Sequence, residues 1–581
     1  MSKYVIGLDF GTNSCRSLIV DTKNGKELAT HVYAYPSGND GVIVDPHDPN
    51  VARQNPADYI KGIEAIIKGA LKKARSVRKS FSASDVIGIG VDTTGSSPMP
   101  LDVHGSALCF SKQFKNNPAA MVWLWKDHSG YAEATRITAL ASEIRPGYLS
   151  KIGGTYSSEW WWSKILHCLK TAPEVFDAAY SWMEICDWIP AMLVGQTSVS
   201  AMKRSICAAG HKAMFNRSWN GLPDQEFLNK LAPELAVLRP RLYDEAFTAE
   251  EPAGFLSPAW ADKLGLSEHV AVAVGAFDAH MGAVGAGIGA GTLVKIIGTS
   301  TCDIMIHPHQ QQLQDIPGVC GIVDGSVMQG YYGIEAGQSG VGDIFLWLVN
   351  TLVPDSYGKT QEEKFKNLEA VAAKLKPGES GLLALDWNNG NRTILVDVRL
   401  TGLLLGQTLH TTPFEIYRAI IEATGFGALE IIDRIEQYGV QVRDVINCGG
   451  LAVKNKLMMQ IYADIIGRPM KVSRSGQTPA LGAGIFAAVA AGKQAGGYDS
   501  VEDAEAAMAA QTDEYMPNKE HHETYQKIFA LYKQLHDGYG TRQWSGSMFN
   551  VMKDLLAIRD GVRKSGVRRT GLRRAVIQET E

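Results

Sequence analysis

The first hundred residues alternate short apolar runs with turn residues, a pattern that predicts strands joined by tight turns. Residues 4–10 (YVIGLDF) and 16–21 (RSLIVD) are rich in the β-branched residues that strands favour. The Asn-Gly pair at 24–25 is a strong hairpin signal, and residues 27–34 (ELATHVYA) follow as a third strand. We therefore expect the chain to open with an antiparallel meander whose first turn carries Asp9.

A marked helix start follows the meander. Asn55 occupies an N-cap position, Pro56 the first helical position and Asp58 the first turn, and isoleucines then recur at helical spacing. Residues 86–92 (VIGIGVD) follow as a buried strand. Strands, helix and strand in this order predict a mixed α/β layer.

The second half of the chain repeats this arrangement. Two predicted strands joined by a tight GTST turn precede a long helix, a strand, a shorter helix and a last strand, over residues 293–297, 302–306, the region from Pro413, 444–450, 455–467 and 470–473. Each half thus contains a β-turn-β loop rich in Gly and Thr. This repetition indicates duplicated domains that face each other across a cleft.

Residues 105–265, between the two halves, are irregular and rich in aromatic side chains. This stretch is either an elaboration that builds a binding pocket or the aromatic core of a large domain. The longest apolar run, residues 479–492 (PALGAGIFAAVAAG), is too short to span a bilayer and predicts a buried helix.

Composition limits the domain number and the kinds of partner. The chain has 581 residues, 45% of them hydrophobic, which is enough for two large domains. Its net charge of −4 argues against nucleic acid or a membrane as the main partner. Its eight cysteines form no CxxC pair, so we expect reduced thiols. With no signal sequence at the start, we expect a cytoplasmic protein.

The first turn places a carboxylate, Asp9, next to groups that bind phosphate. These groups are unhindered N–H groups, hydroxyls and a cation, and they come from Gly11, Thr12, Asn13, Ser14 and Arg16. Such a turn can wrap the terminal phosphates of a nucleotide, and Mg²⁺ held by Asp9 would separate the carboxylate from the phosphates. Taken alone, the residues fit an Asx-turn in a plain hairpin equally well.

The second turn is the matching half, because Gly298, Thr299 and Ser300 can clamp the same phosphates. A further turn, Gly449-Gly450, follows a strand and precedes a helix. Its glycines permit close approach of a base or an α-phosphate, although a simple tight turn is the alternative. No GxGxxG pattern is present there, which disfavours a dinucleotide fold.

Asp278 precedes a run of Ala and Gly that can pack closely as a helix. From spacing alone, a helix cap is the favoured interpretation of this carboxylate. The alternative is a general base that accepts the proton of a sugar hydroxyl as the hydroxyl attacks phosphorus.

The order of these segments resembles the FGGY family of carbohydrate kinases. The segments GLDFGT, GAFDAHMGAVGAG, IGTST and CGG carry the resemblance, and GIGVDTTGSSPMPLD, WLWKDH, YSSEWWWSKILH, AGHKAMF and GIEAGQS extend it from residue 4 to about 560. The resemblance implies an α/β, two-domain ATPase fold of the actin and hexokinase type, with ribonuclease H-like domains and a deep interdomain cleft. It places an N-terminal kinase domain at 1–288, a C-terminal kinase domain at 289–550 and a helix with a basic tail at 551–581.

The resemblance also implies residue roles. It makes Asp278 the catalytic base and Asp9 a Mg²⁺ ligand, with Thr12 and Asn13 near the phosphates of ATP. It assigns the second phosphate loop and the adenosine site to Thr299, Gly449, Gly450 and Asn455. It assigns the sugar pocket to Lys212, Glu335 and the backbone around Gly95 and Ser96, with Trp125, Asp127, Glu159 and Trp160 as weaker candidates.

The function that the resemblance implies is transfer of phosphate from ATP to the 5-hydroxyl of a ketopentose, most similar to the members that act on L-ribulose in pentose catabolism. D-Ribulose, xylulose and ribitol are alternative substrates, and a homodimer is a family expectation. The rivals from other classes are an actin- or chaperone-like ATPase and a non-catalytic sugar sensor. The aromatic segment, Lys212 and Glu335 suit a buried polyol, which favours the kinase over the ATPase.

Overall fold

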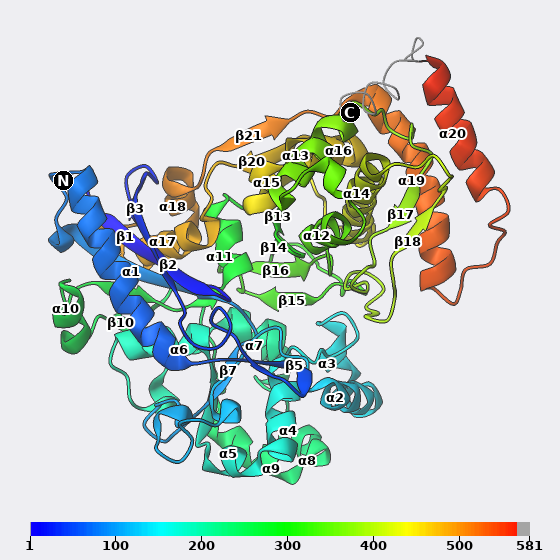
Figure 1. Ribbon diagram of the computed structural model, residues 1–581. Helices are drawn as coiled ribbons and strands as arrows, with labels where there is room; N and C mark the ends of the chain where they lie inside the picture. Colours follow the sequence, from blue (N-terminus) through cyan, green and yellow to red (C-terminus); the bar gives the residue numbers. More distant parts are fainter. Residues whose placement is uncertain (1, 566–581) are drawn as a thin grey trace. The chain divides into compact units, whose positions relative to one another are not determined.

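The computed structural model describes residues 2–565, and the chain divides into two compact units (Figure 1). In the described part, unit 1 comprises residues 2–294, 304–335 and 475–511, and unit 2 comprises residues 295–303, 336–474 and 512–565. Both units are therefore built from separated stretches of the chain. The basic tail, with Arg568, Arg569, Arg573 and Arg574, lies outside the described residues.

The main sheet of unit 1 opens with the predicted meander. Its strands are Tyr4–Phe10 (β1), Ser14–Asp21 (β2), Glu27–Ala34 (β3), Val86–Thr93 (β6), Pro252–Phe255 (β10), Ala271–Ala273 (β11) and Ala276–Phe277 (β12). The order is β10-β11-β6-β1-β2-β3, with β12 beside β6. β1, β2 and β3 are antiparallel in succession, whereas β6 runs parallel to β1.

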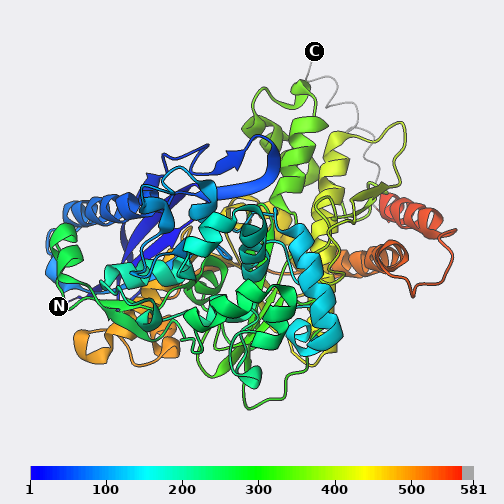
Figure 2. The same ribbon diagram turned by 90° about the horizontal axis from the view of Figure 1, so that it is seen from below.

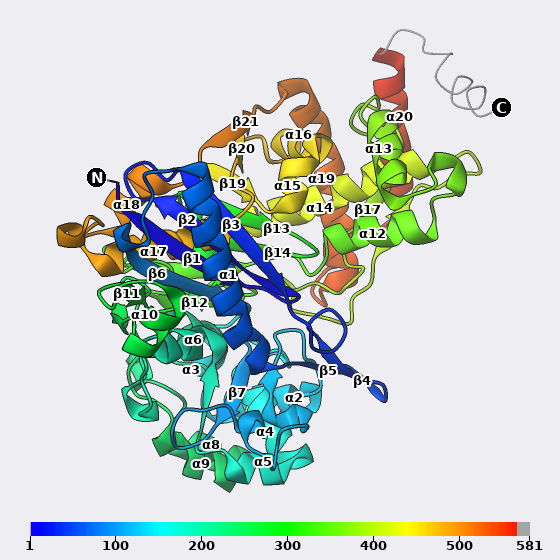
Figure 3. The same cartoon turned by 60° about the vertical axis from the view of Figure 1, so that its left-hand side comes forward.

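One face of this sheet is covered by α1, Pro56–Val77, which lies along the meander in Figure 3. The helix starts where the sequence predicts, because the side chain of Asn55 accepts a hydrogen bond from the N–H of Ala57 at 3.0 Å. Its buried face packs on β2 and β3. The hydroxyl of Ser17 also donates to the carbonyl oxygen of Ile66 at 2.7 Å, which ties the helix to β2.

The opposite face is covered by α17, Thr478–Ala491, the predicted buried helix. The helix backbone lies directly on the strands: a Cβ at Gly7 would be 1.7 Å from the carbonyl oxygen of Ala480, and one at Gly90 would be 1.8 Å from that of Ala483. α11, Asp278–Gly285, packs on α17 equally closely. Only residues without a side chain permit these approaches.

Side-chain alternation along β1 and β6 decides where the carboxylates of these strands point. Asp9 shares a strand face with Gly7, and Asp92 shares one with Gly90, so both carboxylates lie on the face covered by α17 and α11. Phe10 points the other way, towards Tyr59 of α1. The first residue of α11 is Asp278, so three acidic residues lie on the same side of the sheet.

The aromatic stretch 105–265 forms short helices that gather below the sheet in Figure 1 and face the viewer in Figure 2. They are Tyr131–Ile144 (α2), Pro146–Ser150 (α3), Trp161–Thr171 (α4), Pro173–Ala178 (α5), Ile185–Leu193 (α6), Ile206–Lys212 (α7), Gln225–Leu231 (α8), Pro233–Leu238 (α9) and Pro258–Leu264 (α10). Trp123, Trp161, Trp162 and Trp182 are fully buried in this part of the unit. For these four tryptophans the core interpretation is correct.

Smaller elements complete unit 1. They are the strands Ile43–Asp45 (β4), Asp48–Gln54 (β5) and Val122–Trp123 (β8), the pair Pro98–Leu101 (β7) and Ser181–Glu184 (β9), the hairpin Gly321–Asp324 (β15) and Tyr331–Ala336 (β16), and the helix Val501–Met508 (α18). α7 packs against β15. Glu335 lies near the end of β16 and pairs with Gly321 of β15.

The hairpin at residues 292–308 is divided, with residues 295–303 in unit 2 and its outer ends in unit 1. Apart from those outer ends, unit 2 contains the predicted strands and helices of the second half together with elements that the sequence did not predict. They are Thr292–Ile297 (β13), Thr301–Pro308 (β14), Leu383–Leu385 (β17), Leu403–Leu405 (β18), Asp444–Cys448 (β19), Met470–Ser473 (β20), Thr512–Tyr515 (β21), Gly342–Thr351 (α12), Gln361–Ala372 (α13), Pro413–Gln437 (α14), Gly450–Lys454 (α15), Lys456–Ile466 (α16), Lys519–Gly540 (α19) and Val551–Ser565 (α20). β19 runs parallel to β20, and β20 is antiparallel to β21. α14 packs against α13 and α16, and α16 packs against α19.

Two further findings bear on the sequence predictions. All eight cysteines carry free thiols, as expected from their scattered spacing. Among residues 2–565, every helix is too short or too polar to cross a lipid bilayer.

Candidate active site

Asp9 and Asp92 face each other across two parallel strands. They are direct register partners in β1 and β6, and their exposed fractions are only 7% and 0%. Asp9 also lies opposite Arg16 in β2, with the Arg16 Nε 3.3 Å from its Oδ2. Burial raises the pKa of Asp9, and Arg16 partly offsets this rise.

Asp92 forms no ion pair of this kind within residues 2–565, although the charge of Arg16 offsets part of the rise in its pKa. Neither of its carboxyl oxygens receives a hydrogen bond from an N–H or O–H donor within residues 2–565. Burial raises the pKa of Asp92 well above its usual value, and the negative charges of Asp9 and Asp278 raise it further. The carboxyl of Asp92 contacts the carboxyl of Asp9, and two buried carboxyls can lie this close only if they share a proton or a cation.

Asp278 is the first residue of α11 and not its cap. The N-cap is Phe277, so the cap interpretation is wrong for Asp278. Its Oδ1 accepts a hydrogen bond from the N–H of Ala279 at 2.7 Å. Burial and the charge of Asp9 raise the pKa of Asp278 to about 7, which is the range in which a general base works best near neutral pH.

The loop after Asp9 is a regular hairpin turn rather than an Asx-turn. The N–H of Gly11, which an Asx-turn at Asp9 would use, donates instead to the carbonyl oxygen of Ser14 at 3.0 Å. Asn13 is exposed and donates to the carbonyl oxygen of Asp40. Thr12 receives a hydrogen bond on its hydroxyl from the Trp125 indole at 3.0 Å. The Asp9 carboxylate is therefore not needed to form the turn.

Lys212 and Glu335, the proposed sugar ligands, form a buried ion pair within unit 1. The Lys212 Nζ lies 2.9 Å from Oε1 and 3.3 Å from Oε2 of Glu335, and each residue is 6% exposed. The rings of Trp160 and Phe277 lie 5.3 Å and 5.9 Å from the same ammonium group. Burial alone would raise the pKa of Glu335, but Lys212 outweighs it and keeps the carboxyl ionised.

The backbone at Gly95 and Ser96 is held from both sides by buried charges. The Ser96 hydroxyl and the N–H of Ser97 donate to the carboxyl of Glu184. The Nζ of Lys164 donates to the carbonyl oxygen of Ser96 at 2.7 Å. Gly95 itself touches the ring of Phe277, the residue before Asp278: a Cβ there would lie 1.9 Å from that ring. This segment is thereby placed next to the start of α11.

The four weaker pocket candidates, Trp125, Asp127, Glu159 and Trp160, have different surroundings. Asp127 is fully buried and accepts from the Arg53 side chain, the N–H of Ala52 and the Ser129 hydroxyl, so its oxygens are engaged in holding the fold. Trp160 covers the ammonium of Lys212 and so lies at the ion pair. Trp125 contacts the first loop through Thr12, and Glu159 lies 3.8 Å from a ring nitrogen of His128.

In unit 2, the turn at Gly298 and Thr299 is exposed. Its carbonyl oxygens accept from the chain that leads into α12: Val341 donates to Thr299 at 2.8 Å, and Gly342 donates to Gly298 at 3.2 Å. Because these bonds use the carbonyl groups, the turn has a fixed shape.

Gly449 and Gly450 separate β19 from α15. Gly449 has a φ of +95°, and a Cβ there would lie 2.4 Å from the carbonyl oxygen of Ile297 in β13, so only glycine fits. A Cβ at Gly450 would meet nothing within 4 Å. Asn455 caps α16 by accepting from Met458 at 2.9 Å and donates to the Tyr417 hydroxyl. Its contact with a base stays a prediction.

Sequence reasoning missed three buried charged residues of this site: Asp92, Lys164 and Glu184. A signal for Asp92 was available, because the strand that ends GVDT repeats the Gly-Xaa-Asp pattern of GLDF. Lys164 and Glu184 lie among aromatic residues without a recognisable spacing. Only the fold brings them to Ser96.

A buried carboxylate at a helix start, an ion-paired lysine and two Gly/Thr hairpins are features that suit an enzyme transferring phosphate to a hydroxyl. Family comparison agrees: the FGGY family of carbohydrate kinases matches through its N-terminal domain over residues 4–285 and its C-terminal domain over residues 293–491. The chain belongs to this family and is an ATP-dependent carbohydrate kinase.

Curated relatives align over nearly the full length. The chain is 41% identical over 573 residues to the ribulokinase of Halalkalibacterium halodurans, an alignment that covers 96% of this chain and 98% of the relative. It is 39% identical over 577 residues to the ribulokinase of Mycolicibacterium smegmatis, with coverage of 96% and 98%.

Solved structures establish the fold. A xylulose kinase from Rhodospirillum rubrum matches with a TM-score of 0.75 at 19% identity, covering 92% of this chain and 99% of that one. A gluconate kinase from Lactobacillus acidophilus matches with a TM-score of 0.74 at 19% identity, covering 93% and 99%. The fold is therefore the two-domain, actin- and hexokinase-like ATPase fold that the sequence predicts.

Proposed function

We propose that this protein transfers the γ-phosphate of ATP to the 5-hydroxyl of L-ribulose, giving L-ribulose 5-phosphate and ADP. The observation that carries the proposal is the grouping of Asp278 with the Lys212–Glu335 pair, because the charges of Lys212 and Glu335 both act on the Asp278 carboxyl. The ribulokinase relatives at about 40% identity support the choice of sugar.

Asp278 acts as the general base. Its carboxylate accepts the proton of the O5 hydroxyl while O5 forms a bond to the γ-phosphorus and the bond from that phosphorus to the β–γ bridging oxygen breaks. The bridging electrons stay on ADP. The N–H of Ala279 holds the carboxylate in place, and the raised pKa makes Asp278 a stronger base than an exposed aspartate.

Lys212 and Glu335 bind sugar hydroxyls as donor and acceptor. Together they present an ammonium and a carboxylate at one point, which fits a polyol whose hydroxyls both donate and accept. The backbone around Gly95 and Ser96, held in place by Glu184 and Lys164, would form a further part of the sugar pocket. A sugar without the matching hydroxyls would leave buried charges unpaired, which costs affinity.

The phosphates of ATP would be bound by the first loop, with Gly11, Thr12, Asn13, Ser14 and Arg16, and by Gly298 and Thr299. Gly449, Gly450 and Asn455 would take the adenosine part. Short, unhindered turns of this kind present N–H groups to anions. Each of these assignments is a prediction for mutagenesis.

Asp9 and Asp92 would hold Mg²⁺. Carboxylate oxygens are the donors that Mg²⁺ prefers, and the two buried oxygens of Asp92 that receive no hydrogen bond within residues 2–565 fit such a cation. When bound, the cation supplies positive charge that stabilises the negative phosphates. Asp9 provides the second carboxylate, oriented by Arg16.

The experiment is a coupled ADP assay with ATP and Mg²⁺ across L-ribulose, D-ribulose, D-xylulose and ribitol, with phosphorus NMR of the product. We expect ADP only when a sugar is added, the largest kcat/KM for L-ribulose, and a 5-phosphate product. A larger kcat/KM for another member of the panel would replace L-ribulose. Sugar-independent ADP release would contradict the kinase assignment and favour an ATPase.

Two further expectations accompany this function. We keep a homodimer as a family-based prediction, which sedimentation velocity would test. A cytoplasmic location also stays a prediction, which fractionation of the source cells would test.

A further inference from the structure

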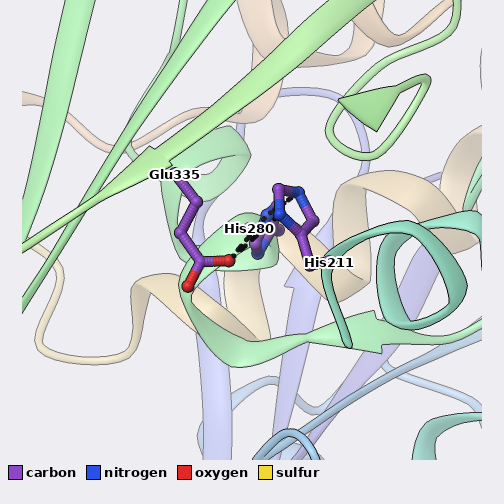
Figure 4. Close-up of side chains that lie close together, drawn as sticks. All are labelled: His211, His280 and Glu335. Carbon is purple, nitrogen blue, oxygen red and sulfur yellow. Dashed lines mark hydrogen bonds and ion pairs between the residues drawn. The ribbon is translucent and has the colours of Figure 1, made fainter. Parts of the chain in front are cut away.

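Two buried histidines beside the sugar pocket have no role in the mechanism above. His211 and His280 are 0% and 2% exposed, and their Nε2 atoms lie 3.0 Å apart (Figure 4). Glu335 lies next to them: its Oε2 is 3.3 Å from the Nδ1 of His211 but 3.9 Å from the Nε2 of His280. His211 is therefore the intermediary between His280 and the carboxylate.

The contacts determine which nitrogens carry protons. The Nδ1 of His211 lies 3.3 Å from the Oε2 of Glu335 without the geometry of a hydrogen bond, so the two atoms are in polar contact only. A carboxylate repels a lone pair, so this contact favours the proton on Nδ1. A neutral imidazole has one N–H, which leaves the Nε2 of His211 as an acceptor. The Nε2 of His280 then donates to it. The Ser326 hydroxyl lies 3.0 Å from the same His211 nitrogen and 3.3 Å from the carbonyl oxygen of Val323; with the proton of His211 on Nδ1, it donates to the histidine.

The remaining nitrogen agrees with this assignment. The Nδ1 of His280 is buried and meets no hydrogen-bond partner within residues 2–565. As a bare lone pair it leaves no N–H buried without a partner, and orphaned N–H groups are rarer in proteins than under-satisfied acceptors. Burial also lowers the pKa of both histidines, that of His280 to about 4, so both rings are neutral near pH 7.

The chain of contacts joins the three elements that carry the proposed chemistry. His211 precedes Lys212 at the end of α7, His280 lies two residues after Asp278 in α11, and Glu335 lies on β16. The fold leaves room for it at Gly321, where a Cβ would lie 2.2 Å from the Nδ1 of His211.

We propose that the chain His280→His211→Glu335 is a positioning relay that fixes the Glu335 carboxylate for the sugar hydroxyl and sets the affinity for the sugar. The inference rests on the proposed function. Oε2 faces His211 and makes the longer contact to Lys212, at 3.3 Å, whereas Oε1 makes the shorter one, at 2.9 Å, and is the oxygen presented with the ammonium. The two histidines touch neither ATP nor the reacting atoms in this proposal.

The test compares each histidine with two replacements. His211→Asn keeps an N–H near the position of Nδ1, and His280→Gln keeps one near Nε2, whereas the alanine variants keep neither. We expect His211→Ala to raise the KM for L-ribulose about fivefold, the effect of losing one polar contact of about 1 kcal/mol to a buried charge, with the KM for ATP unchanged. His211→Asn should recover most of that loss, and kcat should change by less than about threefold in all four variants.

The double variant separates a relay from two independent effects. If His280 acts only through His211, His211→Ala/His280→Ala should be no worse than His211→Ala alone. Additive losses, an unchanged KM with a fallen kcat, or an Asn variant as poor as the Ala variant in a protein with wild-type thermal stability would overturn the relay. If His211→Ala does not fold, the KM of His280→Ala against His280→Gln decides the same question.

A metal site is the competing explanation, because one ligand atom from each of His211, His280 and Glu335 lies within 4.8 Å of the others. Elemental analysis of the purified wild type, with activity after chelation and addition of Zn²⁺ in excess Mg²⁺, tests it. One equivalent of zinc that activity requires would overturn the relay, and zinc-independent activity supports it. A wild type inactive on every sugar of the panel would instead refute the proposed function.

Discussion

The two hairpins have similar turn sequences and differ in what their charges do. Residues 11–16 (GTNSCR) and 298–303 (GTSTCD) share Gly, Thr and Cys at the first, second and fifth positions, have small polar residues at the third and fourth, and carry opposite charges at the last. That last residue forms an ion pair with the preceding strand in both: Arg16 with Asp9 at 3.3 Å, and Asp303 with Lys295 at 2.6 Å.

The Lys295–Asp303 pair is fully buried and has its charges balanced, which we call closed, whereas the Arg16–Asp9 pair is partly exposed and faces a further carboxylate, which we call open. Lys295 and Asp303 have fully buried side chains, and Lys295 also donates to Gln338 at 3.2 Å. The Arg16 side chain is 34% exposed, and Asp9 faces a second carboxylate, Asp92. The second hairpin therefore balances its charge internally, whereas the first holds an excess of negative charge that a cation can neutralise. We therefore expect the first pair to bind a cation and the second pair to stabilise the fold.

The largest effect should follow removal of Asp278, the proposed base, whose carboxyl lies near Asp9 and Asp92 of the first hairpin's sheet. Asp278→Asn keeps the size of the side chain but cannot accept the hydroxyl proton, so we expect kcat to fall by about 10³-fold, within the range for a general base. Steady-state kinetics measure this, and ligand titration should show near-normal binding of ATP and sugar. A variant with more than a tenth of wild-type kcat would remove Asp278 from the mechanism.

The closed pair should control stability. Lys295→Met leaves Asp303 buried and unpaired, and we expect a loss of about 3–5 kcal/mol in the free energy of unfolding, measured by urea denaturation. Lys295→Met/Asp303→Leu should recover much of it, because no lone charge remains. If Lys295→Met unfolds at the wild-type urea concentration, the pair is not structural and the comparison fails.

The open pair should control metal use instead. Asp9→Asn removes a carboxylate whose ionisation burial disfavours, so stability should be unchanged or higher at pH 7. The Mg²⁺ concentration for half-maximal activity should rise about tenfold or more, since a hydrogen bond or ion contact to a charged group is lost. Mn²⁺ binding followed by electron paramagnetic resonance gives a readout without catalysis, and Asp92→Asn should weaken it as well. Unaltered Mn²⁺ affinity in both variants would contradict the site.

A smaller effect is expected from pH. Asp278 must be ionised to accept a proton and its pKa is about 7, so kcat/KM should rise with pH through 7 and level off above it. Below the midpoint the slope should approach tenfold per pH unit for one essential group. A profile that stays flat down to pH 5.5 would show that the base titrates lower.

The smallest effect is expected at the second turn. A Cβ at Gly298 would be 3.9 Å from the carbonyl oxygen of Ser300, an ordinary contact, so Gly298→Ala should fold normally. If phosphate approaches this turn, the added methyl group should raise the KM for ATP about fivefold with the sugar KM unchanged, since poor packing of one methyl costs about 1 kcal/mol. Gly147→Ala, at a position with nothing within 4 Å, is the matched control. Equal ATP KM values for the two variants would exclude Gly298 from the site.

Much of the fold was predictable because its local signals agree. The Asn55 cap and Pro56 mark the start of α1, the β-branched runs mark β1 and β2, and the small-residue run marks α17. The boundaries drawn at residues 288 and 550 stay predictions. Assignment of 475–511 to unit 1 could not be foreseen, because it depends on the glycines of β1 and β6 meeting α17.

Site residues that belong to sequence motifs could be predicted, whereas those whose contacts arise only from burial in the fold could not. The loops around Asp9 and Asp278 carry recognisable residues. The relay of His211 and His280 does not, since a histidine beside Lys212 or Asp278 acquires its partner only when α7, α11 and β16 pack together. Spacing alone also misplaced the cap of α11 by one residue.

The glycine-lined face of β1 and β6 is covered by α17, which is synthesised late in translation. Residues 478–491 are synthesised after the 139 residues 336–474 of unit 2, so the nascent N-terminal sheet stays uncovered on that side for most of translation. Expression of the first 294 residues alone would leave the same bare surface, a ready template for aggregation. Deletion from residue 475 onward should therefore destabilise unit 1, which carries Asp9, Asp92 and Asp278, in addition to removing the end of the chain.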